Sequence, residues 1–197
     1  LSKISKKLGS KLIHISTDCV FDGDCGGYSE TDQPNARDLY GLTKQLGEIL
    51  DKDHVITLRT SIIGHQQSGF GSLVDWFLSQ NGHVKGYSRA YFSGLPTVTL
   101  SRIMARYCIT ESDLTGLYNV ASMRISKLEL LKLVKAAYEK DIQITACDQV
   151  SIDRSLDGSK FAKVTGFSCP DWPALIDEMR TSWLDSSDNI RVKDVQK

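Results

Sequence analysis

The chain has 197 residues, of which 41% are hydrophobic, and its 24 Lys and Arg residues balance 24 Asp and Glu residues. This length and apolar content can supply the buried core of one domain or slightly more. The balanced charge argues against a nucleic-acid partner, because phosphate backbones are bound by basic surfaces. No apolar run approaches bilayer-spanning length and no signal peptide is recognisable, so we expect no membrane partner.

The five cysteines and four histidines are scattered along the chain. The cysteines are odd in number and lack C-x-x-C spacing, which argues against a disulfide framework and predicts a reducing compartment, the cytoplasm. Isolated histidines are usually structural or solvated, so we predict no metal site.

The first predicted element is the end of a helix over residues 2–8, with Gly9 as its left-handed terminator. Because the first residue is Leu1 rather than Met, we expect the chain to begin in the middle of a fold, after a further segment of the same protein. The next predicted elements are a buried strand over 11–16, a polar loop over 23–35, a helix over 40–50, a second buried strand over 55–60 and a helix around 73–78.

The second half alternates shorter strands with helices. A capping box, Ser126-Lys127-Leu128-Glu129, opens one helix, and Pro173 is a favoured first position of the last helix, which we expect to reach about Trp183. The remaining predicted elements are strands over 84–87, 117–120 and 142–145, and a frayed polar tail over 186–197. Alternation of strands and helices predicts an α/β fold with a mainly parallel sheet.

The strongest chemical signal is the pair Tyr40 and Lys44, which lies at the start of a predicted helix. Positions i and i+4 share one helix face, and a nearby ammonium favours phenolate, which makes a phenol a better acid or base near neutral pH. Thr17, at the end of the preceding strand, can hydrogen-bond a carbonyl to which Tyr40 gives a proton. A half-exposed surface pair is the alternative, but this edge of an α/β sheet is where ligands bind. The arrangement suits ketone reduction.

These residues lie within a longer pattern that covers most of the chain. Its segments are Ser16-Thr17-Asp18-Cys19-Val20-Phe21-Asp22-Gly23, Tyr28-x-Glu30-Thr31-Asp32-x-Pro34, Tyr40-Gly41-x-x-Lys44-x-x-Gly47-Glu48, Leu58-Arg59-Thr60-Ser61-Ile62-Ile63-Gly64, Ser93-Gly94-Leu95-Pro96-Thr97, Asp153-Arg154-Ser155-Leu156-Asp157 and Thr165-Gly166-Phe167. The combined pattern resembles the dTDP-4-dehydrorhamnose reductase group of extended short-chain dehydrogenases.

The resemblance implies a Rossmann domain that holds NADP or NAD and a smaller lobe that binds a nucleotide sugar. We therefore expect residues 1–80 to form the second half of the Rossmann domain, a doubly wound parallel sheet, and residues 81–185 to form mainly an α/β substrate-binding lobe. The implied activity is NAD(P)H-dependent reduction of a keto group, at C4, of a nucleotide-activated deoxysugar in cell-surface polysaccharide biosynthesis. A homodimer is left open.

The resemblance also implies roles for individual residues. The catalytic residues would be Thr17, Tyr40 and Lys44, and Lys44 would also hold the ribose hydroxyls of the nicotinamide half. The expected cofactor contacts are Ser16, Tyr40, Lys44, Ser61 and Ile62. The expected substrate contacts are Asp18, Cys19, Phe21, Thr97 and Arg154. For Arg154, diphosphate binding by its guanidinium and a solvated side chain are both open.

Cys19 and Ile62 depart from the family pattern, which has Tyr and Trp at these positions. Both positions line the sugar site in relatives, so the identity of the sugar stays open, and a plain buried thiol is the alternative for Cys19. The resemblance implies a glycine-rich phosphate turn, which we expect upstream of Leu1. We interpret Gly69-Phe70-Gly71 as the entry to a helix, because it lacks the third small residue and the downstream acid of a dinucleotide site.

Two other functions stay open. The beta subunit of methionine adenosyltransferase keeps this fold for partner binding, so a non-catalytic regulatory or scaffold subunit is one alternative. The intact Thr17, Tyr40 and Lys44 favour an enzyme over a scaffold. The second alternative is an epimerase/reductase that resembles GDP-fucose synthase. It would need an acid–base pair on either side of the sugar, which Cys19 and His65 could supply if they lie close together in space.

Overall fold

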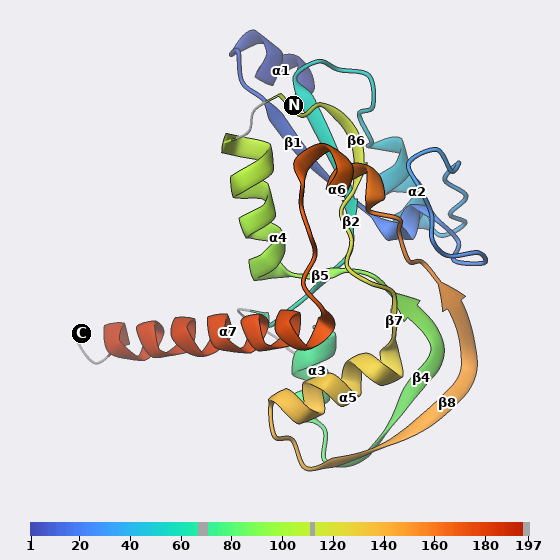
Figure 1. The fold of residues 1–197 in the computed structure, drawn as a ribbon, viewed down its shortest axis with the longest axis vertical. Helices are drawn as coiled ribbons and strands as arrows, with labels where there is room; N and C mark the ends of the chain where they lie inside the picture. The colour runs from blue at the N-terminus through green and yellow to red at the C-terminus, as the bar shows by residue number, and fades with distance from the viewer. Residues whose placement is uncertain (67–70, 111–112, 195–197) are drawn as a thin grey trace.

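The computed structural model describes residues 1–66, 71–110 and 113–194, with side chains described as far as Ser186 (Figure 1). Gly69 and Phe70 of the predicted helix entry therefore lie outside the described residues. The predicted N-terminal helix is present as α1 (Ser2–Lys7), and Gly9 adopts a φ of 62°, as expected for a left-handed terminator.

The central sheet is parallel and has the order β1-β2-β6, formed by β1 (Leu12–Thr17), β2 (Val55–Thr60) and β6 (Gly116–Asn119). Both strand pairs are parallel, and every residue of the middle strand β2 is buried. A strand covered on both faces needs a continuous apolar run, which explains why β2 was recognisable from its sequence. The predicted α/β fold with a parallel sheet is confirmed.

A second three-stranded sheet has the order β7-β4-β8, in which β4 (Gly82–Phe92) lies between β7 (Ile125–Ser126) and β8 (Ile142–Asp153). The strand β4 is antiparallel to β7 and parallel to β8, with an irregularity between Tyr87 and Arg89. Figure 1 shows β4 and β8 as a long curved pair with α5 against them. A third, two-stranded sheet is formed by β3 (Ile62–Ile63), which follows β2 in the chain, and β5 (Leu95–Pro96), which follows β4.

The predicted helices differ from the observed ones mainly at their ends, and the helices over Thr97–Ile103, Met104–Thr110 and Ser159–Thr165 were not predicted. Helix α2 (Leu39–Leu46) stops before the predicted residue 50, because Gly47 caps it, and the last helix continues to Asp194. The predicted end of the last helix near Trp183 is therefore wrong, and the polar tail over 186–197 stays a prediction. The remaining helical elements are η1 (Asp18–Val20), α3 (Leu73–Ser79), α4 (Thr97–Ile103), the π-helical η2 (Met104–Thr110), α5 (Lys127–Ala137), α6 (Ser159–Thr165) and α7 (Trp172–Asp194).

One hydrophobic core joins the two sheets. It contains Ile56 and Leu58 of β2, Phe77 of α3, and Leu130 of α5, all at 0% exposure, together with buried residues of α4, α6 and α7. Strand β6 comes from the range expected for the smaller lobe, yet it pairs with β2 of the first range. The division of the chain at about residue 80 stays a prediction.

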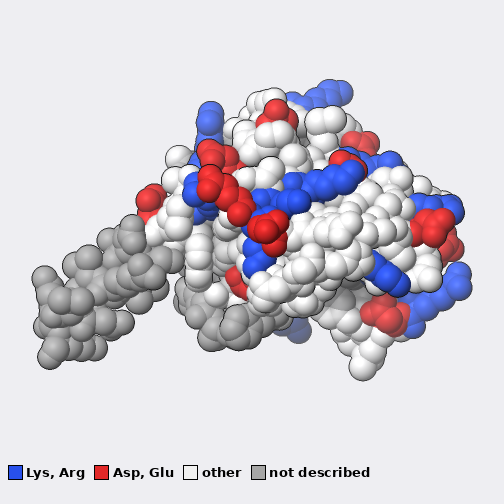
Figure 2. All heavy atoms as spheres, turned by 90° about the horizontal axis from the view of Figure 1, so that it is seen from below, with Lys and Arg blue, Asp and Glu red and all other residues white. Residues whose placement is uncertain are grey.

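Charged side chains of both signs lie interspersed on the face shown in Figure 2. Among the described residues, no helix combines the length and the apolar character that are needed to span a membrane.

Candidate active site

The predicted site begins where β1 ends. Thr17 is the N-cap of η1: its Oγ1 accepts a hydrogen bond from the Cys19 amide at 3.1 Å and donates one to Asp18 Oδ1 at 3.0 Å. Thr17 is also the register partner of Thr60, the last residue of β2, so Ser61 follows at the same edge of the sheet. The carboxyl ends of the parallel strands therefore bring Thr17 and Ser61 together.

Helix α2 carries Tyr40 and Lys44 to this edge. Asp38 caps the helix by accepting a hydrogen bond from the Gly41 amide at 2.8 Å. The Lys44 ammonium donates to the carbonyl oxygen of Ile15, in β1, at 2.6 Å. Tyr40 is 56% exposed, and its hydroxyl forms no hydrogen bond with any described residue. The tyrosine is thus presented to solvent beside a lysine that is fixed to the strand.

A glycine sets the distance between α2 and η1. Gly41 is buried, and a Cβ atom at this position would overlap the carbonyl oxygen of Cys19 and the side chain of Ala36. Only glycine allows the helix to approach the strand end this closely. This approach positions Tyr40 relative to Thr17.

Behind the site lies a buried ion pair. Arg59 of β2 and Glu48 have side chains that are 2% and 3% exposed, and the guanidinium donates to the two carboxylate oxygens at 2.8 and 2.7 Å. Ser16 donates its hydroxyl to Glu48 at 2.7 Å, and the Arg59 guanidinium lies 5.2 Å from the centre of the Phe21 ring. The network ties β1, β2 and the segment after α2 into one unit.

Asp18 and Cys19, in η1 directly after β1, lie close to Arg154. Burial raises the pKa of Asp18, while hydrogen bonds from Thr17, Cys19 and Ser61 and the charge of Arg154 oppose this shift. Burial also raises the pKa of the Cys19 thiol, which argues against a nucleophilic thiolate. Arg154 Nη1 donates to Cys19 Sγ at 3.4 Å, across 135 residues of sequence.

Arg154 keeps donor capacity for a ligand. Its Nη2 lies 3.8 Å from Asp38 Oδ2, whereas its Nε is buried without a hydrogen-bond partner among the described residues. The Nε atom is not accessible to a ligand, but the Arg154 side chain as a whole is 26% exposed, so a polar ligand group can approach its other part.

A cavity of about 300 Å³ lies beside the edge. It is lined by Ile62, Ile63, Gly64, His65, Gln66, Gly71, Ser72, Leu73, Phe92, Thr97 and Lys127. Ile62 is 57% exposed, so the predicted cofactor contact presents an apolar side chain here. Thr97, the first residue of α4, lines the same cavity.

Phe21 differs from the other predicted site residues. Its ring is fully buried and stacks on Tyr28, with the ring centres 4.1 Å apart, while Arg59 covers it from nearby. The side chain therefore supports the wall behind the site and does not face a ligand.

His65 is occupied on both ring nitrogens. Nδ1 lies 2.6 Å from Asp75 Oδ1 and Nε2 lies 2.8 Å from the Tyr138 hydroxyl, and the ring stacks on Trp183 with centres 4.4 Å apart. Its side chain is 4% exposed. His65 thus joins α3, α5 and α7 and has no nitrogen left to pair with Cys19 on a substrate.

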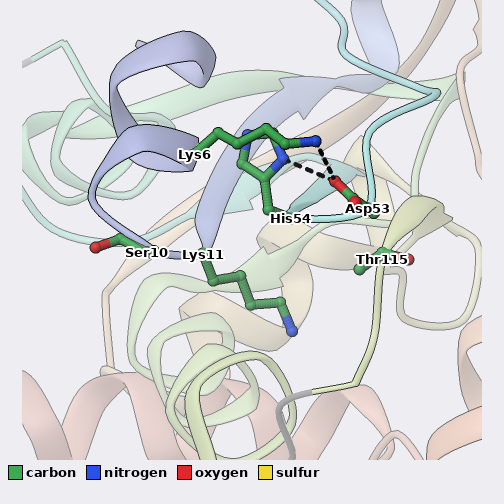
Figure 3. A pocket seen from close by; sticks show the side chains of 7 residues that line it. Lys6, Ser10, Lys11, Asp53, His54 and Thr115 are labelled. Atoms are coloured by element: carbon green, nitrogen blue, oxygen red, sulfur yellow. Dashed lines mark hydrogen bonds and ion pairs between the residues drawn. The ribbon is translucent and has the colours of Figure 1, made fainter.

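Another cavity, of about 340 Å³, lies at the opposite end of the central sheet, where the strands begin (Figure 3). Lys6 and His54 both point to Asp53 there, with Lys6 Nζ 3.3 Å and His54 Nδ1 3.2 Å from Asp53 Oδ1. Ligands of open α/β sheets bind at the carboxyl ends of the strands, so we place the active site at the other edge.

Residues 1–183 match the family model described as the RmlD substrate binding domain. The chain belongs to this family. A solved structure titled as a hypothetical dTDP-4-dehydrorhamnose reductase from Sulfolobus tokodaii is 31% identical, with a TM-score of 0.72 over 87% of this chain and 65% of that one. The dTDP-4-dehydrorhamnose reductase of Bacillus anthracis, solved in complex with NADP, is 21% identical, with a TM-score of 0.75 over 90% of this chain and 67% of that one.

Among curated relatives, the bovine methionine adenosyltransferase 2 subunit beta is 50% identical over 48 residues, which are 24% of this chain and 14% of that protein. The chain thus spans about two thirds of the length of these two solved relatives, and its match to the bovine protein covers a smaller share of that protein.

Within this family framework, two features of the site escaped sequence reasoning. Glu48 and Arg59 lie in two of the segments that resemble the family, but the ion pair between their side chains was not predicted. The signal was available, because an arginine inside an otherwise buried strand needs a charged partner. Lys127 was read only as part of a capping box, and no local pattern indicated that its side chain lines the cavity.

Proposed function

We propose that this chain forms the catalytic part of an NAD(P)H-dependent reductase that acts on a keto group of a nucleotide-activated deoxysugar. The observation that supports the proposal is the packing of helix α2, which carries Tyr40 and Lys44, against η1 and β1 next to Thr17, with Lys44 bonded to the Ile15 carbonyl. We assign the keto group to C4 and the product to cell-surface polysaccharide biosynthesis, as in the dTDP-4-dehydrorhamnose reductases that the chain is similar to.

We assign the nicotinamide half of the cofactor to the residues at this edge. Lys44 would hold the ribose hydroxyls, and Ser16, Ser61 and the exposed side chain of Ile62 lie along the same edge. When bound, NADPH or NADH supplies a hydride. Thr17 would turn its hydroxyl proton from Asp18 to the substrate carbonyl and so orient it, and the unbonded hydroxyl of Tyr40 donates a proton to its oxygen.

The proposed substrate contacts are Asp18, Cys19, Thr97 and Arg154. Arg154 is the best supported, since its guanidinium lies beside Cys19 and its side chain is 26% exposed. A planar guanidinium matches the oxygen atoms of a diphosphate. We therefore assign the diphosphate of the nucleotide sugar to Arg154.

The proposal also includes a preceding segment of the same polypeptide, a second copy in a homodimer and a location in the cytoplasm. Strand β1 is at the edge of its sheet among the described strands, and we propose that a preceding segment of the same polypeptide, carrying the phosphate turn, pairs with it. Exposed Leu39 and Leu46 of α2 offer an apolar face for that segment or for a second copy in a homodimer. All five cysteines are free, which suits the cytoplasm.

The test is the oxidation of NADPH or NADH by the full polypeptide, followed by absorbance, with a 4-keto-6-deoxy nucleotide sugar as substrate. Turnover that depends on the keto sugar supports the proposal. Cofactor binding with no turnover across a panel of keto nucleotide sugars would contradict it.

A regulatory or scaffold subunit is the second candidate. It is favoured by the 50% identity over 48 residues to the bovine methionine adenosyltransferase 2 subunit beta. A scaffold would lack keto-sugar turnover and would instead change the activity of a copurifying enzyme. The epimerase alternative has less support, because His65 is bonded to Asp75 and Tyr138 through both nitrogens.

We expect Gly41→Ala to lower turnover by roughly 10²-fold, because the added methyl group pushes α2 away from η1 and a displacement of about 1 Å at a catalytic group has this effect. The same overpacking should lower the free energy of unfolding by about 1–3 kcal/mol. Steady-state kinetics and urea denaturation measure the two effects. The control is Gly47→Ala at the end of α2, where the added Cβ atom would lie 3.4 Å from its nearest neighbours, an ordinary van der Waals distance. Equal losses in both variants would contradict the positioning role.

A further inference from the structure

Lys127 is a cavity-lining cation that the proposed chemistry does not use. It is the first residue of α5, after the Ser126 cap, and it lines the 300 Å³ cavity with Ile62 and Thr97. Its ammonium lies 3.8 Å from the centre of the Phe92 ring. No hydrogen bond or ion pair joins this ammonium to another residue in the part of the chain that the structure describes.

This placement is unfavourable for a lysine in the absence of a ligand. Burial lowers the pKa of the Lys127 ammonium to about 8, although Asp18 and Cys19 raise it. The first turn of a helix also disfavours a cation, because the N-terminal end carries partial positive charge. An apolar side chain would fill the same space without these costs, so packing does not explain the charge.

A second lysine of the chain shows the contrast. Lys160 also lies over an aromatic ring, 4.7 Å from the centre of Tyr118, but its ammonium donates to the Leu117 carbonyl at 2.8 Å and is exposed. Its surroundings satisfy its charge. The ammonium of Lys127 has no hydrogen-bond acceptor among the described residues, and its side chain lines a cavity that Ile62 and Thr97 also line.

We propose that Lys127 binds an oxyanion of the substrate in this cavity. The proposal rests on the proposed function, and it adds a second cation to Arg154 near Asp18 and Cys19. Two sources offer this chemistry: the diphosphate of a nucleotide sugar, or a carboxylate on the sugar ring. An ammonium gives such an oxygen a charge-assisted hydrogen bond and recovers the cost of its own burial.

The test compares Lys127→Met with the matched charge removal Lys160→Met by calorimetric titration of the full polypeptide. The probes are thymidine diphosphate, inorganic pyrophosphate and glucuronate, with thymidine as the uncharged control. We expect Lys127→Met to weaken anion binding by about 10-fold to 100-fold, the value of one charge-assisted hydrogen bond, and to leave thymidine unchanged. Lys160→Met should bind every probe as the wild type does.

A loss confined to the two diphosphates assigns the oxyanion to the nucleotide, and a loss confined to glucuronate assigns it to the sugar. Equal affinities in the wild type and Lys127→Met, or no binding of any anion to the wild type, would overturn the proposal. Thermal unfolding distinguishes a ligand-binding role of Lys127 from a structural role. If Lys127 binds a ligand, Lys127→Met is at least as stable as the wild type, whereas a structural role makes the variant less stable.

A measurement on the wild type covers the case in which the variant does not fold. Reductive methylation near pH 8, followed by mass spectrometry, should modify Lys127 readily, and saturating thymidine diphosphate or glucuronate should protect Lys127 but not Lys160. Lack of protection by either anion contradicts the proposal. These readouts need no turnover, so anion binding through Lys127 in a polypeptide that reduces no keto sugar would contradict the proposed function alone.

Discussion

Tyr40→Phe is expected to lower the turnover of keto-sugar reduction by roughly 10²–10⁴-fold, the usual contribution of a positioned proton donor. The Tyr40 hydroxyl is solvent-facing and makes no hydrogen bond with a described residue, so its removal breaks no internal contact. The affinity for NADPH and the free energy of unfolding should therefore change little. Absorbance of the reduced cofactor, under saturating and limiting substrate, measures the loss.

Tyr87→Phe is the matched control, because Tyr87 is a 40% exposed tyrosine on β4, away from the proposed site. We expect its kinetics to equal those of the wild type. If Tyr40→Phe and Tyr87→Phe turn over at the same rate, Tyr40 is not the proton donor and the assignment of the trio fails.

Glu48→Ala is expected to lower the free energy of unfolding by about 3–5 kcal/mol, the cost of leaving one member of a buried ion pair unpaired. Arg59 is 2% exposed and donates two hydrogen bonds to Glu48, and Ser16 donates a third. Removal of the carboxylate leaves a buried guanidinium and a hydroxyl without their acceptor. Urea denaturation of both proteins gives the difference.

The comparison for this variant is Glu129→Ala, which removes an exposed carboxylate paired with Lys132 at 2.8 Å on α5. An exposed pair of this kind contributes less than about 1 kcal/mol. The double replacement Glu48→Leu with Arg59→Met should recover much of the loss, because it removes both charges together. A loss in Glu48→Ala no larger than in Glu129→Ala would show that the pair is not buried as described.

The strands and helices show which local signals carry structural information. The strand β2 was predicted with its observed bounds, because all of its residues are buried and its sequence is nearly continuous in apolar and β-branched residues. The strands β4 and β8 were predicted only over 84–87 and 142–145. The remaining residues of β8 are mostly exposed, and the end of β4 that contains the buried Ala90 and Phe92 was not predicted, so pairing between β4 and β8 decides their length.

The helix α4 illustrates the opposite case. Its first residues, Thr97, Val98 and Thr99, have low intrinsic helix propensity, and no helix was predicted there. Leu100 and Ile103 are buried in the common core, and this packing stabilises the helix against the local preference.

By itself, the sequence determined the α/β class and the parallel strands, and it predicted Thr17, Tyr40 and Lys44 at one edge, because these depend on hydrophobic periodicity and on the order of strand, loop and helix. The tertiary structure decided which distant residues join them. Arg154 reaches Cys19 across 135 residues, and Lys127 lines the cavity beside Ile62. Such contacts depend on the path of the whole chain, since the charge and burial of each side chain are set by neighbours that no local pattern specifies.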